Sequence, residues 1–267
     1  MNWIEANGAS LRYDLSGSGS DTVVAIHEVG GCIESWDDAL LALQRRFRVL
    51  RYDQRGFGMS ERTRTITMDG TVADLVALVD ALRITGPVHL VGCAMGAAVA
   101  LAFAGRYPAR IGRIVVASPA TWANADPEAA RKRIDEIERG GVRAVEQGSL
   151  AASYPEVMRG LDRSRFERFR RRWLANDPEA MAAILRMSTN PAFDLSADLA
   201  RITAPTLVIG CTHDGIRTPA MVTKVVAQIP GATYVEAGSG HFMAVETPDM
   251  FVDLAMPFLT AGAAGAR

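Results

Sequence analysis

The stretch "VHLVGCAMGAAVA", residues 88–100, combines an apolar run, a glycine-flanked turn and a series of small residues. This order predicts a buried strand that turns sharply into a helix. Such a turn projects the side chain at its tip above the end of the strand, and small residues two positions away on each side prevent a clash. Gly92 and Gly96 occupy those two positions, so Ala94 is at the tip. The methyl group of Ala94 has no atom that can attack a substrate.

The composition is that of an ordinary globular protein. The chain has 267 residues, of which 49% are hydrophobic and 22% charged, with a net charge of -1. This near-neutral charge gives no general attraction to nucleic acid or to an acidic membrane. Cys32, Cys93 and Cys211 are widely spaced and odd in number, so we expect neither a disulfide framework nor a metal site.

Two features of the sequence bear on where the protein acts. Its first residues lack the basic segment and apolar run of a signal peptide. No apolar stretch approaches the roughly 20 residues that are needed to cross a bilayer. We therefore expect a cytoplasmic protein without a membrane partner.

Strands and helices are expected to alternate along most of the chain. Three β-rich runs come first, at residues 2–6, 10–15 and 22–27, and the Gly-containing turns between them are typical of hairpins. From there to Ser118, apolar strands alternate with amphipathic helices, which predicts a parallel sheet covered on both faces.

This alternation stops after residue 121 and resumes near residue 198. The segment between contains helix-start signals, Asp126-Pro127 and Asp177-Pro178, and no convincing strand. We predict a first core part at residues 1–121, a helical lid at 122–197, a second core part at 198–260 and a flexible tail at 261–267.

Five segments together resemble the α/β-hydrolase family. They are "IHEVGG" (26–31), "YDQRGFGMS" (52–60), "GCAMG" (92–96), "GCTHD" (210–214) and "GSGHFMAVETPDMF" (238–251). They occur in the family's order at the ends of expected strands. Their sequences are most similar to those of the 3-oxoadipate enol-lactonase branch and related small esterases. The resemblance implies an eight-stranded, mostly parallel sheet flanked by helices, with a helical lid.

The resemblance also implies roles for particular residues. Ala94 stands at the nucleophile position, His241 is the general base and Asp214 orients its imidazole. The backbone N–H groups of Val29 and Met95 form the oxyanion hole.

Cys93 is an alternative nucleophile beside the tip of the turn. A turn centred on Cys93 needs small residues two positions away on each side, where Val91 and Met95 stand. The other interpretation is a buried residue next to the turn.

Other residues are candidates for the substrate pocket. Glu28 occupies a position where the family usually has glycine, and its carboxylate either points into solvent or borders the pocket. Phe169 and Trp173 belong to an apolar helix face directed toward the pocket or the lid core. The segment 159–172 has seven arginines and two acids. Most of these arginines are expected in solvent, but one or two reaching inward would suit a substrate carboxylate.

Three interpretations of Ala94 remain open. The chain is a Ser-His-Asp hydrolase of a small carboxylic ester or lactone in which serine has been replaced by alanine, an engineered variant that would be inactive. Alternatively, Ala94 is native and the His241–Asp214 pair carries out proton transfer, as in C–C cleavage or decarboxylation. The third is a non-catalytic ligand-binding protein on the same fold. None needs a cofactor or metal, and a monomer or homodimer is expected.

Overall fold

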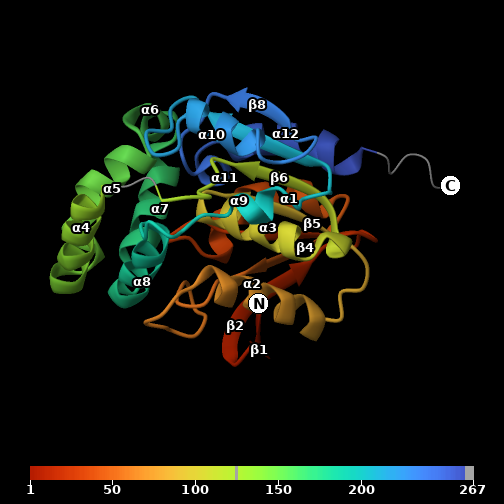
Figure 1. The fold of residues 1–267 in the computed structure, drawn as a ribbon, viewed down its shortest axis with the longest axis horizontal. Coiled ribbons are helices and arrows are strands. Elements are labelled where there is room, and N and C mark those ends of the chain that lie inside the picture. The colour runs from red at the N-terminus through yellow and green to blue at the C-terminus, as the bar shows by residue number, and fades with distance from the viewer. Residues whose placement is uncertain (124–125, 262–267) are drawn as a thin grey trace.

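A computed structural model describes residues 1–123 and 126–261. Its centre is one eight-stranded sheet in the order β1-β2-β4-β3-β5-β6-β7-β8 (Figure 1). The strands from β4 to β8 in this order pair in parallel. The predicted eight-stranded, mostly parallel sheet is thus confirmed. The strands are β1 (Asn2–Ala6), β2 (Ala9–Ser16), β3 (Thr22–Ile26), β4 (Arg48–Tyr52), β5 (Val88–Cys93), β6 (Ile111–Ala117), β7 (Thr206–Cys211) and β8 (Thr233–Ala237).

The first three strands do not form two successive hairpins. β1 and β2 pair antiparallel through the turn at Asn7 and Gly8, which both have positive φ. β2 then pairs with β4, so the expected second hairpin is wrong. All five residues of β3 are buried. A strand that is apolar on both faces needs neighbours and cover on each side, and β3 therefore lies between β4 and β5.

Helices cover both faces of the sheet. Val24 and Ile26 of β3 point into the cluster formed with α2, α3 and α10, while Val23 and Ala25 point into the cluster formed with α1 and α12. This alternation of side chains is the two-residue period of a strand. The covering helices are α1 (Asp37–Gln44), α2 (Met68–Ala81), α3 (Met95–Arg106), α10 (Pro219–Val226), α11 (Met243–Glu246) and α12 (Pro248–Thr260).

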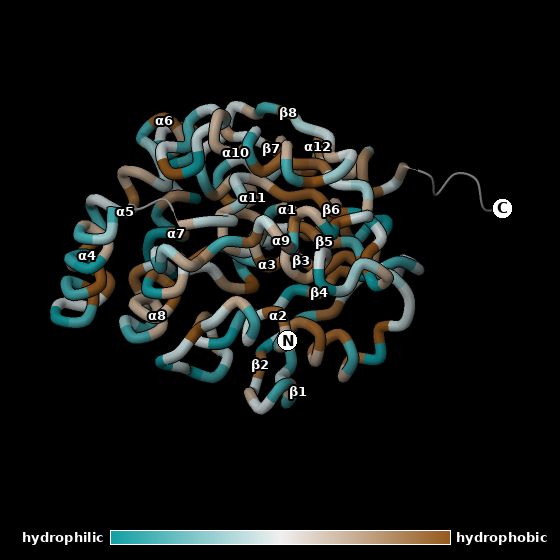
Figure 2. The backbone as a smooth tube through the Cα atoms, in the orientation of Figure 1, coloured by the Kyte–Doolittle hydropathy of each residue, from teal (hydrophilic) through white to brown (hydrophobic). Residues whose placement is uncertain are grey.

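Further helices join β6 to β7, and those within residues 127–188 lie to one side of the sheet (Figure 1). The side chain of Asp126 accepts a hydrogen bond from Ala129 N and begins α4, and Asp177 does the same for Glu179 N at α8. Figure 2 shows apolar and polar residues alternating along these helices. They are α4 (Pro127–Gly140), α5 (Glu146–Ser153), α6 (Glu156–Leu161), α7 (Arg163–Leu174), α8 (Pro178–Ser188) and α9 (Ser196–Leu199).

Short 3-10 turns complete the element order at η1 (Ile33–Trp36), η2 (Pro108–Arg110) and η3 (Val142–Val145). Over residues 1–123 and 126–261, no helix has the length and apolar character that crossing a membrane requires. Residues 262–267 of the predicted flexible tail lie outside the described residues.

Candidate active site

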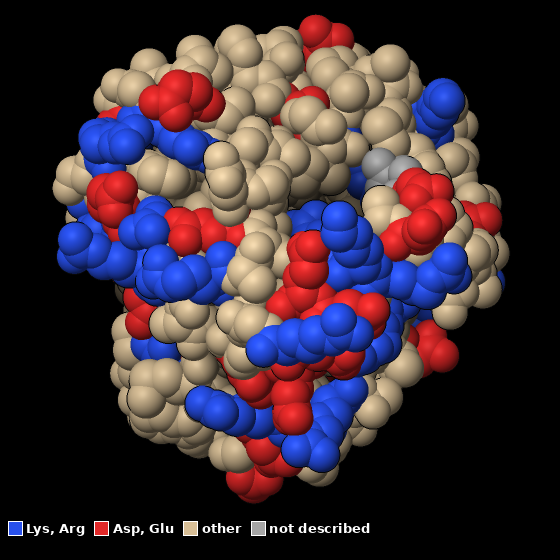
Figure 3. Space-filling view, turned by 90° about the vertical axis from the view of Figure 1, so that its left-hand side faces the viewer, with Lys and Arg blue, Asp and Glu red and all other residues tan. Residues whose placement is uncertain are grey.

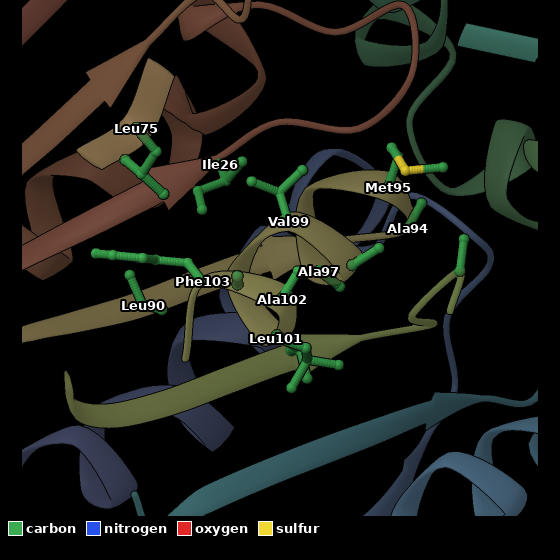
Figure 4. Packing of buried hydrophobic residues seen from close by; sticks show 14 of the residues in the cluster. Ile26, Leu75, Leu90, Ala94, Met95, Ala97, Val99, Leu101, Ala102 and Phe103 are labelled. Atoms are coloured by element: carbon green, nitrogen blue, oxygen red, sulfur yellow. The ribbon is translucent and has the colours of Figure 1, made fainter. Parts of the chain in front are cut away.

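Ala94 is the single residue between the end of β5 and the start of α3. Its backbone has φ 53° and ψ -115°, a conformation that costs a non-glycine residue about 1–3 kcal/mol. Ala94 N donates to Ala117 O at 3.0 Å, and Ala94 O accepts from Ala120 N at 3.2 Å. These bonds to the last residue of β6 and to the segment after it hold the strained turn in place. Figure 4 shows Ala94 and Met95 at the N-terminal end of α3, where both side chains are buried.

Gly92 and Gly96 make this turn possible by the absence of side chains. A Cβ at Gly92 would lie 2.6 Å from Gly96 O, and one at Gly96 would collide with Ile26 O. Both distances are below what real Cβ atoms show, so no larger residue fits without a backbone shift. The tight approach of α3 to β3 and β5 therefore depends on both glycines.

Asp214 and His241 come together from the ends of neighbouring strands. Asp214 follows β7 and His241 follows β8, and the buried His241 Nδ1 donates to Asp214 Oδ2 at 2.7 Å. The other carboxylate oxygen accepts from Ile216 N at 2.7 Å and Arg217 N at 2.9 Å. This arrangement fixes the ring orientation and leaves Nε2 as the nitrogen available to a substrate.

The Asp214 carboxylate stays ionised despite its burial. Burial opposes the charge, but His241 and the hydrogen bonds from His241 and Arg217 N favour it, and the pKa of Asp214 lies below its ordinary value. An ionised carboxylate accepts the Nδ1 proton and stabilises an imidazolium. The pair can therefore move a proton at Nε2.

Ala94 and His241 line the same cavity, whose volume is about 170 Å³. Val29 and Met95, from the loop after β3 and the start of α3, lie in its wall, as does Trp173 of α7. The remaining lining residues are Ala120, Arg133, Ser149, Met181, Leu185, Ser188, Thr189, Ile216, Arg217 and Phe242. The cavity thus lies between the carboxyl ends of the strands and the helices α4 to α8.

Two of the predicted pocket residues do not reach this cavity. Glu28 is 1% exposed, and its Oε1 accepts a hydrogen bond from Ser35 Oγ at 2.8 Å, so the prediction that it points into solvent is wrong. Phe169 packs on Tyr154 and Phe242 with ring centroids 5.3 and 5.2 Å apart. It supports the cavity wall through Phe242 without lining it.

The side chain of Cys93 lies on the face of the sheet opposite to α3. Its side chain belongs to the apolar cluster beneath α1 and α12 and is 1% exposed. Burial raises the pKa of its thiol well above the ordinary value. A buried, protonated thiol is a poor nucleophile, so the structure does not bring Cys93 to the site.

The arginines of residues 159–172 point away from the cavity. Arg165 binds Asp38 at 3.0 Å, Arg170 binds Glu146, and Arg159 stacks 4.7 Å over the ring of Phe166. The expectation that one of these arginines reaches inward is wrong, because within the described chain none of them lines the cavity. The apolar face of α7 is turned inward, which leaves its charged face outside. Figure 3 shows basic and acidic side chains interspersed on the left-hand face of the molecule.

Sequence reasoning missed two arginines that do line the cavity, Arg133 and Arg217. A signal for Arg133 was present, because it lies at helical spacing with the buried residues Ala130 and Ile137 of α4. A charged residue on an otherwise apolar helix face is unusual. Arg217 follows Asp214 by three residues, and no pattern in the sequence indicates where its side chain points.

One cluster of side chains outside the cavity consists of residue types that can bind a metal ion. Ligand atoms of Cys32, Glu34 and Asp53 lie within 4.8 Å of one another. The guanidinium of Arg12 already binds Asp53 at 3.1 Å and also contacts Glu34. Because a cation occupies the position that a metal would take, we assign no metal to this cluster.

Glu246, at the end of α11, is a buried carboxyl behind His241. It is 2% exposed, and burial raises its pKa to about 8 in spite of a hydrogen bond from Phe242 N at 3.3 Å. In the unfolded chain this carboxyl loses its proton near its ordinary pKa of 4.5. Between these two pKa values the carboxyl is protonated in the folded protein and ionised in the unfolded chain. The free energy of unfolding therefore decreases as the pH rises through this range.

We expect Glu246→Gln to remove this loss of stability. Between pH 5 and pH 9 the unmodified chain should lose on the order of 3–5 kcal/mol relative to the variant. Chemical unfolding at a series of pH values measures the difference. Asp249→Asn, at an exposed acid three residues away, is the matched control and should leave the pH dependence unchanged. Parallel curves for Glu246→Gln and the unmodified chain would contradict the prediction.

Comparison with known proteins identifies the fold family. A family model described as the alpha/beta hydrolase fold matches residues 21–248. A pyrrolizixenacetamide deacetylase of Xenorhabdus hominickii is 29% identical over 268 residues, covering 97% of this chain and 98% of that protein.

Two solved structures are similar over nearly the whole chain. The enol-lactonase of Burkholderia xenovorans LB400 has a TM-score of 0.90 and 28% identity, over 97% of this chain and 100% of that one. A thermophilic esterase of Thermogutta terrifontis, solved with malate bound, has a TM-score of 0.89 and 25% identity, over 97% and 98%.

Proposed function

We propose, from the premise that this chain belongs to the alpha/beta hydrolase fold family, that it is the nucleophile-lacking form of a hydrolase of small carboxylic esters or lactones. One observation carries the proposal: Ala94, held in a strained turn, lines the same cavity as His241, whose Nδ1 donates to Asp214. Selection for stability alone does not maintain such strain. The names of the similar proteins, a lactonase, an esterase and a deacetylase, also support acyl chemistry.

The proposed reaction requires a hydroxyl at position 94. His241 Nε2 takes the hydroxyl proton as the oxygen attacks the acyl carbon, and Asp214 stabilises the imidazolium. The N–H groups of Val29 and Met95 hold the developing oxyanion. The imidazolium then protonates the leaving alcohol, and water activated by His241 releases the acid. With Ala94 the first step has no attacking atom, so an ester or lactone binds and remains intact.

The helices between β6 and β7 act as a lid in this proposal. Trp173 of α7 and Met181 and Leu185 of α8 form an apolar wall facing Ala94. An apolar wall displaces water from a bound acyl group and strengthens the electrostatic interactions within the site.

A second candidate function is proton transfer by the pair itself. The observation that favours it is the intact His241–Asp214 hydrogen bond of 2.7 Å in the cavity that Ala94, a residue without an attacking atom, also lines. A positioned imidazole is a general base in its own right. If this candidate is correct, the chain as it stands turns over a substrate, and His241→Ala abolishes that turnover.

The test of the proposed function is binding without turnover. We expect the unmodified chain to bind ethyl butyrate or δ-valerolactone, detected by ligand-observed NMR, and to return it unchanged. Leu185→Trp fills the cavity and should weaken binding about tenfold or more, because the ligand loses its apolar contacts.

Leu161→Trp is the matched control for this test. Leu161 is an exposed leucine of the same helical segment and does not line the cavity, so its replacement should leave binding unchanged. Equal binding by all three proteins would place the ligand elsewhere and contradict the proposal.

A further inference from the structure

Two guanidinium groups enter the cavity from different parts of the fold. Arg133 comes from α4 above the sheet, and Arg217 comes from the loop after β7. The backbone N–H of Arg217 donates to Asp214, while its side chain belongs to the cavity wall. The cationic side of the cavity therefore adjoins the catalytic pair.

Neither guanidinium has an acidic partner among residues 1–123 and 126–261. Arg217 Nη2 donates to the carbonyl of Trp122 at 2.7 Å, and its guanidinium lies 5.1 Å over the indole ring. Arg133 Nη2 donates to Ser149 Oγ. In the described chain, the buried Nε atoms of both residues and Nη1 of Arg217 have no hydrogen-bond partner.

Arg217 is buried and Arg133 half-buried. The buried Arg12 and Arg51 lie outside the cavity and also have an unpaired Nε among the described residues, but each binds carboxylates. Arg12 is bound to Asp53 at 3.1 Å and to Glu34, and Arg51 is bound to Asp14 at 2.9 Å and Asp37 at 2.7 Å. The fold thus supplies carboxylates to these buried cations outside the cavity. A buried cation without one is costly, since desolvation is not compensated by an opposite charge.

The loss of solvent around Arg133 and Arg217 also lowers the pKa values of their guanidinium groups. Burial lowers the pKa of Arg217 to about 10, against the attraction of Asp214, and burial also lowers the pKa of Arg133. Both remain charged at neutral pH. An anion with two acceptor oxygens would satisfy the N–H groups that have no partner in the described chain.

We propose that Arg133 and Arg217 bind a carboxylate of the ligand, so that the substrate is a small ester or lactone with a second, free acid group. The inference rests on the proposed function for the position of the reacting carbonyl. A guanidinium presents paired N–H donors that match the two oxygens of a carboxylate. A cavity of about 170 Å³ favours a short molecule, in which the free acid lies a few bonds from the ester.

The experiment compares monomethyl succinate with dimethyl succinate on the unmodified chain, by calorimetry or ligand-observed NMR. The half-ester should bind about 10- to 100-fold tighter, the range for hydrogen bonds to a charged group. Arg133→Gln and Arg217→Gln should each remove most of this preference and leave binding of the diester nearly unchanged. Added salt should weaken only the half-ester.

Arg168→Gln is the matched control, because Arg168 is an exposed arginine of α7 that donates to Ser164 and does not line the cavity. If Arg217→Gln fails to fold because it loses the bond to Trp122, Arg133→Gln decides the outcome. Equal binding of half-ester and diester, or an equal loss in Arg168→Gln, overturns the inference. Inorganic phosphate binding as tightly as the half-ester overturns the assignment to a carboxylate.

Failure of this inference is distinguishable from failure of the proposed function. The readout is binding, which needs no nucleophile. If Ala94→Ser confers hydrolysis of neutral esters but the half-ester binds no better than the diester, only the inference fails. If the half-ester binds through both arginines and no hydrolysis follows, the carboxylate site stands and the hydrolase proposal fails.

Discussion

The Ala94→Ser variant is expected to hydrolyse small esters or lactones about 10⁴- to 10⁶-fold faster than the unmodified chain. The reason is that the parts of the site that are hardest to assemble are already in place. The turn holds residue 94 at φ 53°, and His241 is oriented by a 2.7 Å hydrogen bond to Asp214. A hydroxyl added at this position completes a nucleophile, base and acid. Steady-state rates on a panel of p-nitrophenyl esters and lactones measure the gain.

Ala120→Ser is the matched control for this gain. Ala120 lines the same cavity but lies outside the strand-to-helix turn, so the variant adds a hydroxyl without placing it at the tip. It should remain as inactive as the unmodified chain. An Ala94→Ser protein that is folded by circular dichroism and inactive on the whole panel would contradict the hydrolase proposal.

In the Ala94→Ser background, Asp214→Asn should lower kcat by roughly 10³- to 10⁴-fold. The carboxylate accepts the Nδ1 proton of His241, and its pKa below the ordinary value keeps it ionised. An amide at this position can donate to Nδ1, which leaves the proton on Nε2, where the base must be unprotonated. It also removes the negative charge that stabilises the imidazolium.

The effect should appear in kcat with KM nearly unchanged, because Asp214 is not among the residues that line the described cavity. Asp249→Asn in the same background replaces an exposed carboxylate and should retain full activity. Equal kcat in the Asp214→Asn and parent proteins would show that the His241–Asp214 hydrogen bond has no part in the reaction.

The sequence by itself was sufficient for the fold class and for the strand-to-helix turn. Gly92 and Gly96 are two residues on either side of Ala94, and that spacing is a local property of the backbone. Apolar strands alternating with amphipathic helices predict a parallel sheet for the same reason. The order of the segments placed Asp214 and His241 after successive strands of a parallel sheet, whose carboxyl ends meet at one edge.

The tertiary structure alone decided which side chains face the cavity. Glu28 turns inward to Ser35, and the arginines of α7 turn outward, because a helix or loop buries whichever face its neighbours cover. Arg133 and Arg217 are 84 positions apart in the chain and line one cavity only through the packing of the helical segment over the sheet. Local periodicity specifies which residues share a face. What that face contacts depends on distant segments, and no local pattern encodes it.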